Sequence, residues 1–444
     1  MKKVITYGTY DLLHRGHIRL LERAKALGDY LIVGVTADGF DRARGKINVQ
    51  QSLMERIEAV KATGIADEII VEEYEGQKID DIQRYGVDIF TVGSDWKGHF
   101  DYLKDYCDVV YLERTQGISS SDLRSEEKKV RLGLVGESNI VNKFERESHY
   151  VNGLSISGVC TQDSSLMNEN VKGLPLVTSQ LDELIAVSDA VYIVSSPQCH
   201  YDQIKEALGK GIHVLCESPI ALNHDQWNEL TQFATKQNCI LMESIKTAYS
   251  MAYYRMLLLA KTGIIGKIIS VDSICTSMRD YASEGRISGW NSICAWGPTA
   301  LLPIFQLLGT NYVKKDIITH KMESEEDYDL FTKVSFVYKN AMASMKVGQG
   351  VKSEGELIIS GTKGYIYVPA PWWKTDYFEV RFENPTDNKR YFYQLEGEGI
   401  RYELVTFLNS IIGGQNLTYI DEKTTSGIIS LIHDYYIKKD LINI

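Results

Sequence analysis

The sequence has little proline, no closely spaced cysteine pair and no long apolar run. Only 8 of its 444 residues are proline, and 44% are apolar against 24% charged, which excludes long disordered or collagen-like stretches. Its seven cysteines are odd in number and widely spaced, so they indicate neither a zinc site nor a disulfide framework. No stretch reaches the roughly 18 apolar residues of a membrane span, and no signal-peptide core follows the N-terminal lysines. We therefore expect a cytoplasmic protein with no membrane partner and no metal site.

The chain also lacks an excess of positive charge. Its formal net charge is −11, and acidic residues outnumber basic ones both before and after Lys129. Bulk charge therefore argues against a nucleic-acid partner. An anionic substrate must be held by a few placed cations and by backbone N–H groups. At roughly 100–200 residues per domain, the chain has room for two to four domains.

Short apolar runs alternate with helical patterns over the first 128 residues. The expected strands are Val4–Tyr7, Leu31–Val35, Glu68–Val71, Asp88–Val92 and Val109–Leu112. The expected helices lie near Ile18–Leu27, Leu53–Thr63 and Gln77–Tyr85. This alternation predicts a parallel sheet flanked by helices. We therefore expect an α/β, Rossmann-like nucleotide-binding domain over residues 1–128, ending at the charged segment 124–129.

Two further domains are expected after this segment. A second alternating series, with strands near Val130–Val135, Leu154–Val159, Ala190–Ser195, His213–Glu217 and Ile240–Glu243, predicts a doubly wound domain over residues 129–248. Long alternating strands then predict an α+β domain with a mostly antiparallel sheet over residues 249–444. Its expected elements are strands at Lys267–Thr276, Thr332–Val347, Glu356–Val368, Phe378–Phe382 and Arg390–Leu395, and helices near Arg401–Ile412 and Thr424–Lys438.

Two histidines, His14 and His17, stand at the turn between the first strand and the first helix. The N-terminus of a helix favours anions through its free N–H groups and its dipole. Two imidazoles at this point can face a bound phosphate. A pair of solvent-exposed loop histidines is the alternative, because short motifs often arise by chance.

The sequence around these histidines resembles the HxGH nucleotidyltransferase superfamily, and more closely the glycerol-3-phosphate cytidylyltransferases of teichoic-acid precursor synthesis. The matching segments are Val4-Ile5-Thr6-Tyr7-Gly8-Thr9, His14-Arg15-Gly16-His17, Leu20-Leu21-Glu22-Arg23-Ala24, Gly93-Ser94-Asp95-Trp96 and Arg114-Thr115-Gln116-Gly117-Ile118-Ser119-Ser120. The resemblance implies that a phosphomonoester oxygen attacks the α-phosphate of CTP, with Mg²⁺, and releases pyrophosphate and a CDP-alcohol. The expected partners are CTP and a small phosphorylated alcohol, for a capsule or wall teichoic-acid-like polymer.

The resemblance also implies roles for individual residues. The expected catalytic residues are His14, His17, Lys46 and Arg114. The expected nucleotide-binding residues are Gly8, Thr9, Tyr10, Asp11, Arg56, Asp67, Gly93, Asp95, Trp96, Thr115, Ile118 and Ser119. As alternatives, Asp67 could only begin a strand and Trp96 could be a core residue. Glycerol 3-phosphate is the acceptor that the resemblance favours. Ser94 and Arg15 depart from the family pattern and could alter recognition of the alcohol, so a related polyol phosphate stays open as the acceptor.

Residues 129–444 resemble the glucose-fructose oxidoreductase / inositol dehydrogenase family. The resemblance rests on the strand-to-helix turn Gly133–Val141 and on the segments 189–200, 207–219, 262–267 and 361–364. It implies possible dinucleotide contacts with NAD(P) at Gly136, Ser138, Pro197, His200 and Glu217.

Several residues of that family's machinery are replaced in this chain. Ser138 stands at the glycine that lets backbone approach a pyrophosphate, and Ser218 stands at the lysine of the usual Glu-Lys-Pro motif. Pro303 and Leu307 replace the usual acidic residue and histidine. We interpret Lys246 as a surface lysine and Tyr281 as a core tyrosine rather than as substitutes.

Two hypotheses follow for the C-terminal part. The first is a degenerate dehydrogenase module that serves as a platform, which the replaced residues favour. The second is a bifunctional enzyme whose C-terminal half reduces a keto-sugar phosphate to the polyol phosphate that the N-terminal half activates. A further alternative for the N-terminal half is a pyrophosphorylase that uses ATP or another acceptor, such as ethanolamine phosphate. Because relatives of both halves commonly self-associate, we expect a homo-oligomer.

Overall fold

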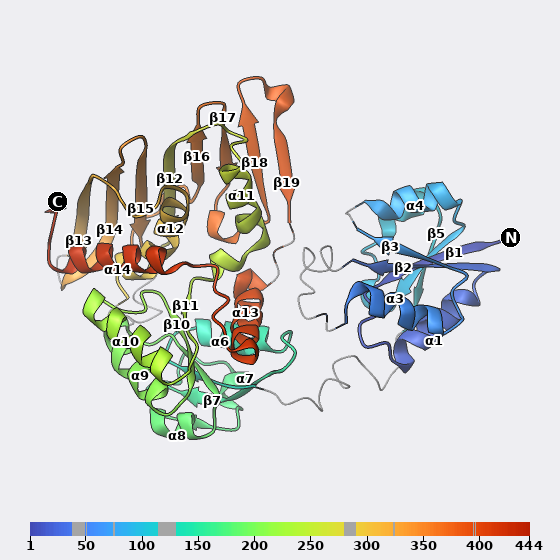
Figure 1. Ribbon diagram of the computed structural model, residues 1–444, viewed down its shortest axis with the longest axis horizontal. Helices are drawn as coiled ribbons and strands as arrows, with labels where there is room; N and C mark the ends of the chain where they lie inside the picture. The colour runs from blue at the N-terminus through green and yellow to red at the C-terminus, as the bar shows by residue number, and fades with distance from the viewer. Residues whose placement is uncertain are drawn as a thin grey trace. The chain divides into compact units, whose positions relative to one another are not determined.

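The computed structural model describes residues 1–37, 49, 51–73, 76–113, 130–278, 290–322, 325–393, 395 and 397–444. The chain divides into two compact units, Met1–Lys128 and Lys129–Ile444 (Figure 1). Each unit is described by itself. Among the described residues, no helix is both long and apolar enough to cross a membrane.

The first unit is built on a five-stranded parallel sheet. Its strands are β1 (Lys3–Gly8), β2 (Tyr30–Thr36), β3 (Glu68–Glu72), β4 (Ile89–Gly93) and β5 (Asp108–Leu112), in the spatial order β3-β2-β1-β4-β5. The helical elements are α1 (Arg15–Lys25), α3 (Leu53–Ala62), α4 (Gln77–Tyr85), η1 (Ser94–Trp96) and η2 (Asp101–Asp105). The strand order reverses between β1 and β4, and ligands of such sheets bind at the carboxyl ends beside that reversal.

Apolar cores cover both faces of this sheet. One core packs Leu21 and Val60, from α1 and α3, against Val33, and the other packs Ile82 of α4 and Leu103 against the opposite face. Figure 1 shows α1 and α3 on one side of the strands and α4 on the other. Burial on both faces explains why the strands are nearly continuous apolar runs and could be located from the sequence.

The second unit begins with a six-stranded parallel sheet. Its strands are β6 (Val130–Val135), β7 (Leu154–Cys160), β8 (Val177–Thr178), β9 (Ala190–Ile193), β10 (His213–Glu217) and β11 (Leu241–Ser244), in the order β11-β10-β9-β6-β7-β8. The flanking helices are α6 (Ile140–Ser148), α7 (Glu169–Lys172), α8 (Leu181–Ala186), α9 (Pro197–Gly209) and α10 (His224–Lys236). Here the strand order reverses between β6 and β9, which places a second candidate binding crevice at their carboxyl ends.

A nine-stranded, mostly antiparallel sheet completes the second unit. Its strands are β12 (Ile268–Thr276), β13 (Lys314–Met322), β14 (Glu325–Val337), β15 (Met342–Gly348), β16 (Leu357–Gly361), β17 (Gly364–Val368), β18 (Tyr377–Phe382), β19 (Lys389–Phe392) and β20 (Leu441–Asn443), in the order β19-β18-β17-β16-β12-β15-β14-β13-β20. The helical elements are η4 (Lys246–Tyr249), α11 (Met251–Lys261), α12 (Ser292–Leu308), η5 (Trp372–Lys374), η6 (Pro385–Asp387), η7 (Gly397–Gly399), α13 (Ile400–Gly413) and α14 (Glu422–Tyr436). Two neighbour pairs, β12 with β15 and β13 with β20, are parallel. In Figure 1, α11, α12 and α14 lie over the sheet.

The predicted fold class is confirmed, with differences inside the large sheet. The expected strands Thr332–Val347 and Glu356–Val368 are each two strands, because turns at 338–341 and 362–363 fold them into hairpins. Helix α12 was not predicted, since it contains Pro298 and Pro303, which normally interrupt helices.

Candidate functional site

Both predicted histidines lie at the carboxyl edge of the first sheet, beside the reversal between β1 and β4. His14 is the N-cap of α1, and its Nδ1 accepts a hydrogen bond from the backbone N–H of Gly16 at 3.0 Å. The His14 and His17 rings stack with centroids 4.0 Å apart and an interplanar angle of 24°. Because Nδ1 of His14 is an acceptor, a neutral ring carries its hydrogen on Nε2.

The turn that presents these rings depends on Gly8 and Tyr10. Tyr10 is buried and has a left-handed backbone with φ 54°, and its ring packs over Gly8. A Cβ at Gly8 would lie only 2.9 Å from Cζ of Tyr10. The Tyr10 ring in turn meets the His17 ring edge-on, with centroids 5.6 Å apart. Packing of the Tyr10 ring between Gly8 and His17 thus sets the orientation of the histidine pair.

Arg56 and Asp11 hold the loop around the histidines. The fully buried Arg56 guanidinium donates to the carbonyl oxygens of Thr9 at 2.7 Å and Thr36 at 2.8 Å, and its Nε donates to that of Gln51 at 3.1 Å. Asp11 accepts from the backbone N–H of Gln51 at 3.0 Å. These contacts tie the end of β1 to the end of β2 and the start of α3.

Asp67 lies elsewhere, and the structure corrects its assignment to the nucleotide site. Its carboxylate accepts from the backbone N–H of Leu31 at 2.6 Å and forms an ion pair with Lys25. Leu31 and Asp67 lie at the amino ends of β2 and β3, whereas the histidines follow the carboxyl end of β1. Parallel strands keep these two edges on opposite sides of the sheet.

Gly93 and Trp96 lie across the reversal from the histidines, at the carboxyl end of β4. Gly93 ends the strand, and Asp95 and Trp96 belong to the turn η1 that follows it. Trp96 is 36% exposed, so it is not the core residue of the alternative interpretation. Its ring meets the His99 ring edge-on, with centroids 5.4 Å apart. The remaining predicted residues lie outside the described part of the chain: Lys46, Arg114, Thr115, Ile118 and Ser119.

The described residues build no metal centre. They contain no group of three or more His, Cys, Asp or Glu side chains placed to hold an ion. The stacked imidazoles are also poor ligands for Mg²⁺, which prefers oxygen. A Mg²⁺ ion that accompanies a nucleotide would therefore depend on the nucleotide's phosphates rather than on a site in this part of the chain.

The second crevice contains a cavity of about 340 Å³ in the second unit. Its lining includes Ser138 and Lys143 after β6, Glu217 and Ser218 at the end of β10, and Lys246 after β11. Lys246 is therefore not the surface residue that we expected. Tyr281 lies outside the described residues.

The glycine-rich turn of this crevice is only partly suited to a dinucleotide. Gly136 has φ 134°, and a Cβ there would lie 2.8 Å from the backbone nitrogen of Ser195. This position therefore requires glycine. At the next glycine position of the family pattern, the Ser138 hydroxyl accepts from the backbone N–H of Ile140 at 3.3 Å. That N–H is one of the groups at the start of α6 that would otherwise face a pyrophosphate.

Pro197 and His200, two of the predicted dinucleotide contacts, are both buried. Pro197 is buried in the first turn of α9. The His200 ring is fully buried between the carbonyl oxygens of Pro219 and Ser195, both at 2.9 Å. Burial lowers the pKa of His200 to about 4, so the neutral ring donates to only one of these oxygens. His200 does not line the cavity.

Glu217 joins a buried cluster at the cavity wall. Its Oε1 accepts from the Tyr192 hydroxyl at 2.7 Å and from the Ser244 hydroxyl at 3.2 Å. Ser244 also lies 3.0 Å from Oε2 of Glu403. Burial raises the pKa of Glu217, and burial together with the nearby Glu217 raises that of Glu403 well above its usual range.

The residues at the family's usual acid–base positions are bonded within the protein or lie away from this cavity. The Ser218 hydroxyl is engaged with Oε1 of Glu243 at 2.5 Å. Pro303 and Leu307 lie further along α12 than its lining residues, which end at Thr299.

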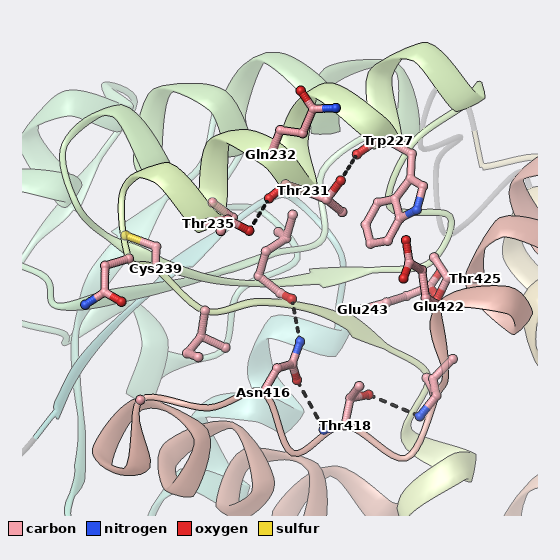
Figure 2. Close-up of a pocket in the computed structure, with 16 residues that line it drawn as sticks. Trp227, Thr231, Gln232, Thr235, Cys239, Glu243, Asn416, Thr418, Glu422 and Thr425 are labelled. Carbon is pink, nitrogen blue, oxygen red and sulfur yellow. Dashed lines mark hydrogen bonds between the residues drawn. The ribbon is translucent and has the colours of Figure 1, made fainter.

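A second cavity, of about 550 Å³, has Glu243 among its lining residues (Figure 2). Thr425 donates to Oε2 of Glu243 at 2.6 Å, and Asn416 donates to the carbonyl oxygen of Leu241 at 3.0 Å. Figure 2 shows that the threonines of this wall also bond to the backbone around them, as Thr231 does to Trp227 at 3.0 Å. Much of the polar lining is thus used within the protein, which disfavours a ligand site.

Comparison with known proteins assigns both parts of the chain. Residues 5–126 match the cytidylyltransferase-like family, and residues 130–245 match the oxidoreductase family with an NAD-binding Rossmann fold. The chain therefore belongs to the cytidylyltransferase-like family through its N-terminal domain, which is fused to a domain of that oxidoreductase family.

The N-terminal domain is similar in sequence to individual proteins over nearly their whole length. It is 50% identical over 126 residues to the glycerol-3-phosphate cytidylyltransferase of Bacillus spizizenii, covering 97% of that protein and 28% of this chain. It is 48% identical over 130 residues to the Staphylococcus aureus enzyme of the same name, covering 95% of it and 28% of this chain.

The C-terminal part shares its fold with known oxidoreductases. A 3-ketoreductase from Actinomadura kijaniata, solved with NADP and TDP-benzene, matches with a TM-score of 0.62 at 15% identity, over 71% of this chain and 99% of that one. An oxidoreductase from Agrobacterium radiobacter matches with a TM-score of 0.59 at 16% identity, over 70% of this chain and 96% of that one. At such identities only the fold is established.

Proposed function

We propose that residues 1–128 transfer the cytidylyl group of CTP to glycerol 3-phosphate, or to a related polyol phosphate, and release pyrophosphate and CDP-glycerol or its analogue. The observation that carries this proposal is the stacked His14–His17 pair at the start of α1, in a domain half identical to glycerol-3-phosphate cytidylyltransferases over nearly their whole length. The product would serve a capsule or a wall teichoic-acid-like polymer.

The reaction joins an oxygen of the acceptor's phosphate to the α-phosphorus of CTP and breaks the bond to pyrophosphate. Charge grows on the α-phosphate and on the leaving oxygen as this happens. His14, through its Nε2–H, and His17 would stabilise that charge beside the N–H groups of α1. Lys46 and Arg114 would neutralise the phosphates, and Thr115 and Ser119 would hydrogen-bond them, as the family resemblance implies.

Nucleotide recognition would come from residues on both sides of the crevice between the carboxyl ends of β1 and β4. Gly8 ends β1 and is followed by Thr9 and Tyr10, while Gly93 ends β4 and is followed by the turn η1 with Asp95 and Trp96. Ile118 would contribute as in the related enzymes. Asp11 and Arg56 would act by holding the first turn in place. Mg²⁺ would arrive with CTP and neutralise its phosphates.

For the C-terminal part we favour a degenerate dehydrogenase module, divided into residues 129–248 and 249–444, that supports a homo-oligomer in the cytoplasm. The Ser138 hydroxyl at the start of α6 and the Ser218–Glu243 bond support this view, because both occupy positions that a working dehydrogenase uses otherwise. The cavity itself, with Lys246 in its wall, favours the bifunctional alternative in which this half reduces a keto-sugar phosphate.

The test is a screen of pyrophosphate release with Mg²⁺ over CTP and ATP and a panel of phosphorylated alcohols. We expect release with CTP plus glycerol 3-phosphate. Equal rates with ATP, or no release with any acceptor, would contradict the proposal. Oxidation of NADPH or NADH with ribulose 5-phosphate or dihydroxyacetone phosphate would instead favour the bifunctional enzyme.

A further inference from the structure

Three lysines from separate elements meet at the rim of the 340 Å³ cavity. Lys143 comes from α6, Lys246 begins η4, and Lys374 ends η5. Lys246 follows Lys143 by 103 positions in the sequence, and Lys374 follows Lys246 by 128 positions. Only the folded chain brings these charges together, in a protein whose net charge is −11.

All three ammonium groups bind one carboxylate. Oε2 of Glu398 accepts from Lys143 at 2.9 Å and from Lys246 at 2.7 Å, and Oε1 accepts from Lys374 at 2.9 Å. The side chains are only partly exposed, from 18% for Lys246 to 34% for Lys374. Although burial acts against its charged form, the lysines, Lys246 foremost, hold the pKa of Glu398 well below its usual range.

The backbone around Glu398 is built to hold this carboxylate in place. Glu398 has φ 53°, and its neighbours Gly397 and Gly399 have φ 61° and 91°. A Cβ at Gly399 would lie 2.5 Å from the carbonyl oxygen of Lys246, and one at Gly397 would lie 2.0 Å from the Glu147 carboxylate. Three successive left-handed residues are costly, and the two glycines permit them.

The cluster keeps an excess of positive charge. Three ammonium groups face one ionised carboxylate. The next acidic groups toward Lys246 are the half-buried Glu217 and the fully buried Glu403, and desolvation raises the pKa of both, which favours their neutral forms. Burial also lowers the pKa of Lys246, while Glu398 opposes this change. A partly desolvated excess of positive charge at a cavity is the environment that binds a phosphate group.

The rest of the cavity suits a small hydroxylated molecule. Ser138 and Thr299 offer hydroxyl groups, and Trp290 and Trp373 offer aromatic surface. A volume of about 340 Å³ is at the lower end for small-molecule sites, which typically span roughly 300–1,000 Å³.

We propose that this cavity binds a small phosphomonoester, of the size of a phosphorylated sugar or polyol, whose phosphate is held by Lys143, Lys246 and Lys374, with Glu398 as the counter-ion of the empty site. The proposal does not depend on the cytidylyltransferase activity of the first unit.

The test is calorimetric titration of the full chain with ribulose 5-phosphate, ribulose and inorganic phosphate. We expect ribulose 5-phosphate to bind, inorganic phosphate to bind more weakly, and ribulose to bind much more weakly than its phosphate. Lys374→Met should weaken binding of ribulose 5-phosphate at least about tenfold, because it removes a hydrogen bond to a charged group. Lys374→Arg should restore most of the affinity. Glu398→Gln should strengthen binding, since it removes a competing anion.

Lys236→Met, at an exposed lysine on α10, is the matched control and should bind like the wild type. Pyrophosphate release from CTP should be unchanged in all variants, so a failure of the first unit's activity would leave the binding comparison intact. Equal affinity in Lys374→Met and the wild type overturns the proposal. So does a Lys374→Met variant that loses NADPH binding but keeps that of ribulose 5-phosphate, because the lysines would then serve a dinucleotide.

Discussion

At the residue scale, the chemistry proposed for the first unit rests on the stacked rings of His14 and His17. His17→Ala should lower kcat/KM for CTP about 30–150-fold, equivalent to about 2–3 kcal/mol, because it removes a preorganised donor from the developing charge. Initial-rate measurements of pyrophosphate release check this. His149→Ala is the control, because that side chain is 68% exposed and lies in the other unit. Unchanged turnover in His17→Ala would remove the histidine pair from the mechanism.

A second residue-scale prediction concerns dinucleotide binding. Ser138→Gly should tighten NADPH binding, because it removes both the Cβ and the hydroxyl that accepts from the N–H of Ile140. Ser138→Ala separates the two contributions, since it removes only the hydroxyl. Fluorescence titration measures the affinities. If the wild type already binds as tightly as Ser138→Gly, Ser138 is not what weakens the site.

At the element scale, a buried carboxylate joins helix α12 to strand β14. Asp329 accepts from the backbone N–H of Ile293 at 3.2 Å and from the Thr332 hydroxyl. Burial raises its pKa to about 6 from an ordinary value of 3.8. A raised folded pKa favours the folded state at low pH, and this contribution is lost as pH rises through about 6.

The second unit should therefore be destabilised through Asp329 by about 1 kcal/mol between pH 5 and pH 8. Asp329→Asn cannot ionise, so the difference in unfolding free energy between variant and wild type should shift by that amount in favour of the variant as pH rises. Chemical denaturation followed by tryptophan fluorescence measures it. A difference that does not change with pH would mean that Asp329 titrates normally.

Elements with a buried, regular pattern could be predicted, and those that depend on distant contacts could not. Strands β1, β2, β4 and β6 are apolar runs bounded by turn residues, and all were located. Helix α12 was missed because its prolines contradict local propensity, and packing against the large sheet overrides them. The sequence predicts a single strand where the β14–β15 hairpin lies, because Lys339 and Asn340 do not interrupt the alternation strongly enough.

The candidate sites divide in the same way. The His14-Arg15-Gly16-His17 motif is local, so the histidine pair could be predicted. Asp67 was assigned by resemblance to the wrong edge of the sheet, because a motif does not state at which end of a strand a residue lies. The lysine cluster has no local pattern at all: the sequence predicts a surface position for Lys246, and only the fold brings it beside Glu398.

At the scale of the whole molecule, the chain consists of two compact units, Met1–Lys128 and Lys129–Ile444. A polypeptide of residues 1–128 should therefore fold and keep the pyrophosphate-releasing reaction with CTP, because the apolar cores on both faces of its sheet are formed within these residues. Circular dichroism and turnover measurements check both parts. A folded but inactive polypeptide would show that the second unit is needed for activity.

The hydrogen bonds around Ser244 bear on how many protons the neighbouring carboxyl groups of Glu217 and Glu403 hold. Ser244 has a single hydroxyl hydrogen, yet its oxygen lies within bonding distance of Oε1 of Glu217 and Oε2 of Glu403. One hydrogen cannot serve two carboxylates. Glu403 is fully buried and Glu217 is half-buried, and no cation is bonded to either among the described residues. The pair should therefore retain an extra proton at neutral pH, visible as a protonated-carboxyl band in the infrared spectrum that disappears in Glu403→Gln.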